Sequence, residues 1–172
     1  LGNSNYTVEA RFMTGTLDAG GSYPIVSFQV GRWFGLEGDH LTVVSGDSAT
    51  TRVNSSTGLT LNDSNWHHVA YVREGNLTNQ LKFYLDGEPV GTGRQDLENT
   101  NGFDIGYDGF STQFNGWLDE VRVWNISLSA DQIRALYRNQ TNIISYNLTG
   151  AHGQNWSVDI TPHDGFEDGD TL

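Results

Sequence analysis

Short stretches in which apolar and polar residues alternate are the feature that most constrains the fold of this chain. Residues 6–12 alternate with a period of two, which is typical of a half-buried β-strand. Further strand-like stretches follow, several of them separated by glycine or Asp-Gly: 25–28, 33–36, 41–44, 66–72, 81–85, 103–106 and 116–124. Many short strands joined by tight turns predict an all-β protein, built as a sandwich of two sheets.

Two local patterns refine this prediction. Asp86-Gly87 directly follows the strand-like stretch 81–85, and Asp-Gly at that place is typical of a hairpin turn. Residues 129–137 have the pattern of a helix, because Ser129 is a suitable N-cap and Ile133 and Leu136 fall on one face. We therefore expect one short helix among the strands.

Several motifs, taken in their order along the chain, resemble the laminin-G-like jelly rolls of the concanavalin A type. The motifs are 66–70, 81–87, 103–106 and 114–125, followed by the short helix. The resemblance covers about residues 6–138 and implies a jelly-roll sandwich of two antiparallel sheets. It does not fix a function, because the family includes lectins, adhesion modules, enzyme appendages and structural domains.

The chain is predicted to divide into a jelly-roll domain, residues 1–138, and a C-terminal extension, residues 139–172. The extension holds two strand-like stretches, 142–148 and 156–161, and residues 156–169 resemble part of an immunoglobulin-like repeat of archaeal and bacterial surface proteins. At the other end only five residues precede the first strand, where the family usually has an extra strand.

Two strands do not bury a core alone, so the extension needs a partner. Three arrangements remain open: donation to an open sheet edge of a neighbouring copy, packing on its own jelly roll, or a fragment cut from a longer chain. Head-to-tail donation generates a filament, because the contact does not close on itself. The expected assembly residues are Ile143, Ile144, Tyr146, Trp156, Val158 and Ile160.

Asn-x-Ser/Thr sequons are more frequent than the composition explains. The 15 Asn and 29 Ser plus Thr residues predict roughly 2.5 sequons by chance, and the chain has eight. This excess favours an N-glycosylated extracellular or cell-surface protein, although Asn, Ser and Thr are also common turn residues. The sequons begin at Asn5, Asn54, Asn62, Asn76, Asn125, Asn139, Asn147 and Asn155.

The charge excludes several classes of partner. Nine Lys and Arg residues stand against 21 Asp and Glu, which gives a net charge of -12 and argues against nucleic acid or anionic lipid as a ligand. No apolar run is long enough to span a bilayer, and residues 1–6 do not form a signal peptide. The chain has no cysteine, so disulfides, thiolate metal sites and cysteine nucleophiles are excluded.

Calcium is the one cofactor that the sequence favours besides covalent glycans, since hard cations take carboxylate and carbonyl oxygens. The resemblance implies Asp119 as the first candidate ligand, because it matches a family position that often contributes to an ion on the outer sheet. Asp104 and Asp108 flank a glycine-rich loop and are the second candidates.

The sequence argues against catalysis. Laminarinase-type relatives carry Glu-x-Asp-x-x-Glu on one strand, whereas here Glu37-Gly38-Asp39 is followed by His40-Leu41-Thr42. His67 and His68 are adjacent on a predicted strand, so they point to opposite faces and do not share a metal. No nucleophile elbow, phosphate loop or zinc spacing is present.

The sequence therefore favours a non-enzymatic, glycosylated structural or adhesive subunit of a surface fibre or large surface protein, assembled through its C-terminal extension. The alternative is a calcium-assisted carbohydrate-binding module. The aromatic residues expected to be free for a sugar are Trp33, Tyr107, Phe110 and Trp156, whereas Trp66, Trp117 and Trp124 are expected to pack in the fold.

Overall fold

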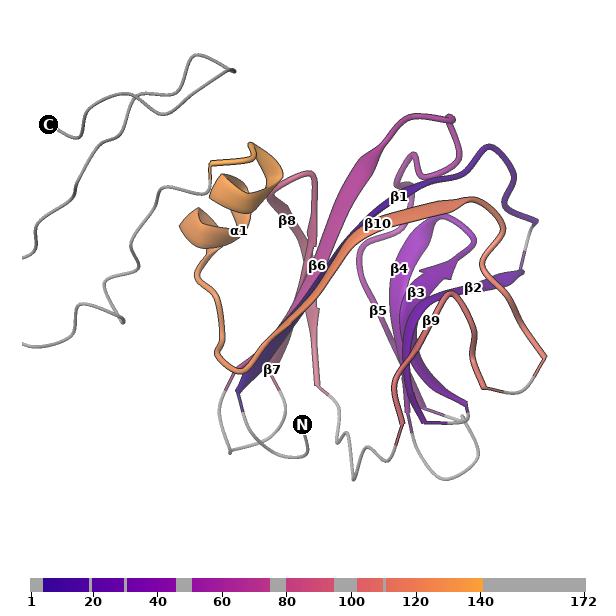
Figure 1. The fold of residues 1–172 in the computed structure, drawn as a ribbon, viewed down its shortest axis with the longest axis horizontal. Coiled ribbons are helices and arrows are strands. Elements are labelled where there is room, and N and C mark those ends of the chain that lie inside the picture. The colour runs from indigo at the N-terminus through magenta and orange to yellow at the C-terminus, as the bar shows by residue number, and fades with distance from the viewer. Residues whose placement is uncertain are drawn as a thin grey trace, which may run out of the picture. The chain divides into compact units, whose positions relative to one another are not determined.

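The computed structural model describes residues 5–18, 20–29, 31–45, 51–74, 80–94, 102–109 and 111–140. These residues form two antiparallel five-stranded sheets and one short helix (Figure 1). The first sheet has the spatial order β10 (Trp117–Trp124), β1 (Tyr6–Met13), β6 (His67–Glu74), β7 (Gln80–Leu85) and β8 (Glu88–Gly93). The second has the order β5 (Thr51–Asn54), β4 (His40–Ser45), β3 (Arg32–Glu37), β2 (Ser22–Gln29) and β9 (Asp104–Ile105).

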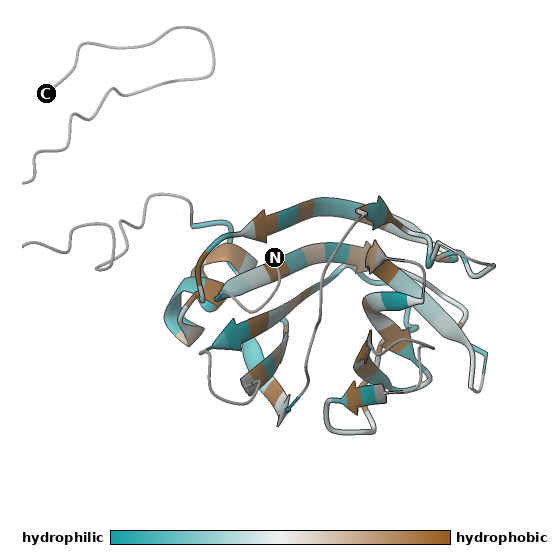
Figure 2. Ribbon diagram, turned by 90° about the horizontal axis from the view of Figure 1, so that it is seen from below, coloured by the Kyte–Doolittle hydropathy of each residue, from teal (hydrophilic) through white to brown (hydrophobic). Residues whose placement is uncertain are grey.

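Every second side chain along the strands points inward, and these side chains form the hydrophobic core between the two sheets. On β1, Tyr6, Val8, Ala10 and Phe12 all have no exposed surface and belong to one apolar cluster with residues of the second sheet. Bands of apolar and polar residues alternate along the strands, as expected when one face of each sheet turns to the core (Figure 2).

The helix α1 (Ala130–Tyr137) covers part of the outer face of the first sheet. It begins with a capping box, in which the Ser129 hydroxyl accepts from Gln132 N and the Gln132 side chain accepts from Ser129 N. Ile133 and Leu128 pack against Val72 of β6 in a second, smaller cluster. Among the described residues, no helix has the length and apolar character needed to cross a membrane.

Two hairpins are closed by two-residue turns in which glycine adopts a positive φ. Between β7 and β8, Asp86 and Gly87 both have positive φ, +50° and +81°, as in a type I′ turn. Between β3 and β4, Gly38 has φ of +59° at the first position of a two-residue turn. The predicted Asp-Gly hairpin is therefore confirmed.

A buried carboxylate joins three strands on the outer face of the first sheet. Glu9 has no exposed surface, and its carboxylate bonds to His68 Nε2 at 2.9 Å, Arg122 Nη1 at 3.1 Å and Trp124 Nε1 at 3.2 Å. Burial alone would raise the pKa of Glu9, but these hydrogen bonds lower the pKa below its ordinary value.

The all-β, two-sheet jelly-roll prediction is confirmed, and the predicted helix is present. The differences lie in element bounds: the strand at 51–54 was not expected, and the stretch 103–106 forms only the two-residue strand β9, whereas 88–93 is the second strand of the predicted hairpin. Residues 141–172 of the C-terminal extension lie outside the described residues, so the predicted domain division is not tested; the assembly residues among them are Ile143, Ile144, Tyr146, Trp156, Val158 and Ile160.

Replacing Glu9 by alanine should destabilise the domain by about 3 kcal/mol, because it leaves His68, Arg122 and Trp124 without their shared acceptor. Since the pKa of Glu9 is lower in the folded state, its contribution is present above the unfolded-state pKa and is lost as the pH falls through the folded one. Urea unfolding measured across acid pH tests both points. Glu88→Gln, which changes an exposed carboxylate on β8, is the control and should have little effect. Equal losses in the two variants would contradict the assignment.

Candidate functional site

A pocket of about 470 Å³ lies at the end of the second sheet where the β3–β4 turn meets two loops. One loop connects β1 to β2, and the other connects β5 to β6. The pocket combines apolar side chains with carboxylates, an imidazole and an amide; its lining residues are Leu17, Asp18, Gly20, Glu37, Gly38, Asp39, His40, Leu59, Leu61 and Asn62. We call it the rim pocket.

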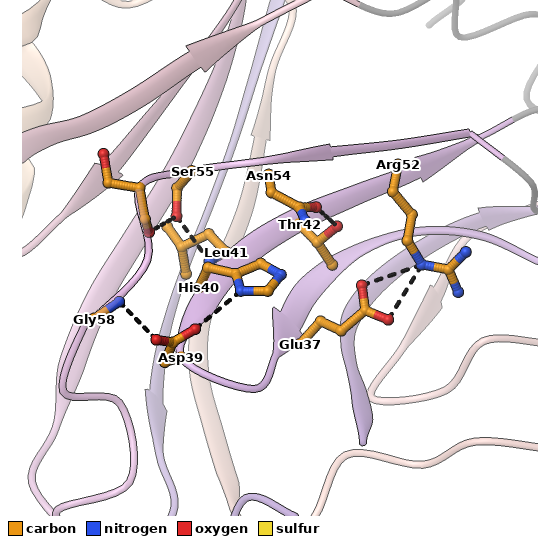
Figure 3. A network of polar contacts seen from close by, with 10 residues as sticks. Glu37, Asp39, His40, Leu41, Thr42, Arg52, Asn54, Ser55 and Gly58 are labelled. Atoms are coloured by element: carbon orange, nitrogen blue, oxygen red, sulfur yellow. Dashed lines mark hydrogen bonds and ion pairs between the residues drawn. The ribbon is translucent and has the colours of Figure 1, made fainter. Parts of the chain in front are cut away.

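Asp39 joins the β3–β4 turn of the rim pocket to the loop between β5 and β6 (Figure 3). Its Oδ1 bonds to His40 Nδ1 at 3.1 Å and its Oδ2 accepts from Gly58 N at 2.7 Å, while its backbone carbonyl accepts from Leu59 N at 2.9 Å. These hydrogen bonds from His40 and Gly58 hold the pKa of Asp39 below its ordinary value. A carboxyl group with a lowered pKa is suited to accept hydrogen bonds rather than to act as a general acid.

The neighbouring strands supply a second group of polar contacts (Figure 3). Arg52 Nε on β5 donates to both carboxylate oxygens of Glu37 on β3, at 3.2 and 3.1 Å. Thr42 Oγ1 on β4 donates to Asn54 Oδ1 at 2.7 Å. The Glu37 carboxylate is thus engaged by a cation, which leaves Asp18, Asp39, His40 and Asn62 as the other polar side chains that line the pocket.

This arrangement suits a small polar ligand with an apolar face. Leu17 and Leu59 are partly exposed and offer aliphatic surface, and Asp39 is a fixed hydrogen-bond acceptor whose side chain remains 56% exposed. Sequence reasoning considered Asp39 only as a possible catalytic carboxylate and did not identify the pocket. The Gly38-Asp39 turn was the available signal, but the two loops that complete the pocket have no sequence motif of their own.

The two adjacent histidines lie in different networks, as the alternation along a strand requires. His67 is almost buried between two carboxylates, with Nδ1 at 2.8 Å from Asp86 and Nε2 at 3.1 Å from Asp63. His68 bonds to Glu9 on the other face of the first sheet. Both imidazoles therefore have structural partners.

The three candidate calcium ligands are not brought together with other ligating side chains. Asp119 Oδ1 accepts from the backbone N of Glu120, and Asp108 Oδ1 accepts from Ser111 N and Thr112 N at 2.9 Å. Asp104 lies on the edge strand β9. Within the described ranges, no group of three or more His, Cys, Asp or Glu residues is placed to hold a metal. The calcium prediction therefore rests on the sequence resemblance.

Every sequon asparagine that falls within the described residues is exposed: Asn5, Asn54, Asn62, Asn125 and Asn139. Exposure is required for a glycan but does not demonstrate one, so glycosylation stays a prediction. Asn76, Asn147 and Asn155 lie outside the described residues. Two sequon hydroxyls also have structural partners, since Thr7 Oγ1 donates to Ile126 O at 2.9 Å and Ser127 Oγ donates to Arg73 O.

The aromatic residues are distributed differently from the expectation. Trp33, expected to be free for a sugar, is 4% exposed, whereas Trp66 and Trp117, expected to pack, are 45% and 67% exposed. The error came from assigning these tryptophans to the core because they belong to sequence motifs. Trp117 is the first residue of β10 and Trp66 directly precedes β6, and neither belongs to the cluster that packs under the helix on the outer face of the first sheet. Phe110 and Trp156 lie outside the described residues.

The fold and the sequence together define the class of protein. Two antiparallel five-stranded sheets with a single short helix form a jelly-roll sandwich. The chain belongs to the concanavalin A-like lectin/glucanases superfamily, whose laminin G-type family model matches residues 1–134. No curated protein matches the chain.

Solved structures with the same fold include proteins that bind carbohydrate. Domain 4 of AbnA, an extracellular arabinanase from Geobacillus stearothermophilus solved with arabinotriose, is 20% identical with a TM-score of 0.61, over 78% of this chain and 68% of that one. A putative carbohydrate-binding protein from Bacteroides ovatus is 19% identical with a TM-score of 0.61, over 78% and 41%. A heptameric pentraxin from Limulus polyphemus is 18% identical with a TM-score of 0.59, over 77% and 69%. At these identities the similarity shows the fold.

His67 should make stability depend on pH near neutrality. Burial alone would lower the pKa of His67, but hydrogen bonds to Asp86 and Asp63 outweigh it and raise the pKa above 6.5. The stabilisation is therefore fully present below pH 6.5 and is lost as the pH rises through the folded-state pKa. In urea unfolding at about pH 5.5 and about pH 8.5, the parent should lose more stability than His67→Gln. Parallel pH profiles of the two proteins would rule out this role.

Proposed function

We propose that this chain is a non-catalytic carbohydrate-binding module of an extracellular, N-glycosylated adhesive protein, and that it binds sugar in the rim pocket. The observation that carries the proposal is Asp39, an exposed carboxylate held by His40 and Gly58 beside the aliphatic surface of Leu17 and Leu59. A sugar ring needs both surfaces, since its hydroxyls donate to acceptors and its C–H face packs on apolar groups.

The comparisons support the ligand class and the location. Two of the structural neighbours are described as a domain in complex with arabinotriose and as a putative carbohydrate-binding protein, and the arabinanase is described as extracellular. The eight sequons support the same location. The sequence reasoning ranked carbohydrate binding as the alternative to fibre assembly; the rim pocket and these neighbours now favour it as the first candidate.

Binding to neutral oligosaccharides, arabinotriose among them, should fall about tenfold or more in Asp39→Asn and in Asp18→Asn, because each removes a charged acceptor from the pocket's edge. Glycan-array binding followed by calorimetry measures this loss. Asp131→Asn is the matched control, because its carboxylate lies on α1, is 93% exposed and is not part of the pocket. Retained affinity in both pocket variants would remove the rim pocket as the site.

Two further conditions belong to the same experiment. Asn62 lines the pocket and begins a sequon, so a glycan at Asn62 and a ligand in the pocket compete; Asn62→Gln should bind at least as well as the glycosylated parent. Calcium assistance is part of the proposal, so binding is measured with calcium and with a chelator, in the parent and in Asp119→Asn. Identical affinities in all four measurements would exclude calcium from this function.

Fibre assembly by strand exchange is the second candidate, and one feature of the described residues favours it. The second sheet ends in β9, which pairs with β2 over only two residues, and the apolar side chains of Phe103 and Ile105 beside this edge are 49% and 53% exposed. An edge with free backbone groups and exposed apolar side chains is the surface to which a donated strand adds. The extension would supply that strand through residues such as Val158.

Head-to-tail exchange predicts a specific mixing result. Ile105→Lys should block the acceptor edge and Val158→Lys the donor strand, so each variant alone should be monomeric in light scattering while the parent forms polymers. A mixture of the two should give dimers that do not grow, because only one acceptor and one donor remain intact. Val123→Lys, on the edge strand β10 of the other sheet, is the control. A monomeric parent would exclude exchange.

A further inference from the structure

An exposed row of large side chains crosses the end of the first sheet on its outer face. On β1 the residues that face the core between the sheets are Tyr6, Val8, Ala10 and Phe12, so by alternation Met13 points to the outer face, as Glu9 does. Trp117, the first residue of β10, lies directly opposite Met13. Residues directly opposite each other in a sheet point to the same face, so Trp117 shares the outer face with Met13.

Trp66 extends this row on the other side of Met13. Phe12 lies opposite His67, and Ser64 N donates to Thr14 O at 3.1 Å, so Trp66 lies beside Met13 between these two contacts. His67 faces Phe12 in the interior, and the neighbouring Trp66 therefore points outward, which agrees with its exposure of 45%. Two strand spacings separate the tryptophans, or about 10 Å.

A cleft of about 180 Å³ opens beside Trp117, and its polar groups are neutral. Met13 and Trp117 line it together with Thr14, Thr16, Ser64 and Asn115. Thr14 Oγ1 donates to Asn115 O at 2.7 Å, which ties the end of β1 to the start of β10 and fixes the cleft. Thr16, Ser64 and Asn115 are exposed, so their hydroxyl and amide groups face solvent around the indole.

We propose that Trp117, Met13 and Trp66 form a second saccharide-binding surface, separate from the rim pocket, that takes a neutral linear oligosaccharide lying across the strands. An indole offers a flat apolar face to the C–H face of a sugar, and hydroxyl and amide groups at its edge meet the sugar's hydroxyls. No charged residue lines the cleft and the chain carries a net charge of -12, so a neutral glycan is favoured over an anionic one.

The spacing of the row gives the two tryptophans different roles. Trp117 borders the cleft and stacks on a sugar unit that also reaches the polar groups. Trp66 is about 10 Å away, so only a chain of several sugar units reaches both indoles. The ligand is therefore an oligosaccharide rather than a single sugar, and its affinity increases with chain length. This inference rests on the proposed carbohydrate-binding function but uses none of the residues of the rim pocket.

The test compares variants of the full chain in affinity electrophoresis and calorimetry. The probes are arabinan, xylan and mixed-linkage β-glucan, together with their mono-, di- and tetrasaccharides. Trp117→Ala should weaken binding of the polymer and the tetrasaccharide about tenfold, and Trp117→Phe should restore part of the affinity. Trp66→Ala should weaken the tetrasaccharide and the polymer but leave disaccharide binding unchanged. Ile126→Ala, an exposed apolar residue just beyond the opposite end of β10, is the control and should bind as the parent does.

The possible results separate this inference from the proposed function. If Asp39→Asn abolishes binding of every probe while Trp117→Ala and Trp66→Ala bind as the parent does, the rim pocket is the saccharide site and the aromatic surface is overturned. If Trp117→Ala loses the tetrasaccharide and Asp39→Asn does not, the aromatic surface stands and the rim pocket is rejected. If the parent binds none of the probes, both fail. Circular dichroism and unfolding curves check that each variant is folded.

Discussion

The cluster of aromatic rings between the two sheets is the interaction on which the rest of the structure depends. Tyr71 of β6 is fully buried, and its ring lies 4.8 Å from Phe34, 5.6 Å from Tyr6 and 6.3 Å from Phe28. The hydroxyls of Tyr71 and Tyr6 bond to each other at 2.9 Å, which satisfies two polar groups that burial would otherwise leave unpaired. Because strands from both sheets meet in this cluster, their facing sides are closed to ligands. Function is left to the ends and outer faces of the sandwich.

The outer face of the first sheet, which the core leaves free, has a covered part and an accessible part. Near its centre, the buried carboxylate of Glu9 is hydrogen-bonded to the buried His68 and to the half-exposed Arg122. A buried carboxylate is tolerated there because both of its oxygens accept hydrogen bonds from donors on neighbouring strands. At the end of the same face, Trp66 and Trp117 have no such cover. The helix α1 and the hydrogen-bonded network around Glu9 cover the middle of this face. The row formed by Trp117, Met13 and Trp66 stays accessible.

Sequence reasoning predicted the fold well, because alternation, the Asp-Gly turn and the Ser129 cap are local signals that the folded chain obeys. It did not predict the rim pocket, since Asp18, Asp39 and Asn62 come from three segments that only the sheet arrangement brings together. It also misassigned Trp66 and Trp117, because a motif identifies a strand but not which part of its outer face the helix covers. Burial at a strand end depends on tertiary contacts, which a single sequence does not encode in its local pattern.

The two proposed binding surfaces share the same supporting segments. Residues 13–18 contribute Met13 to the aromatic row and Asp18 to the rim pocket, and residues 61–66 contribute Trp66 to the row and Asn62 to the pocket. The hydrogen bond from Ser64 N to Thr14 O joins these two segments between the surfaces. Both surfaces therefore lie at one end of the sandwich and are held in a fixed relation. On the proposed function, a glycan bound at one surface would be at a high effective concentration for the other, so that two weak contacts would suffice for firm attachment to a polymer.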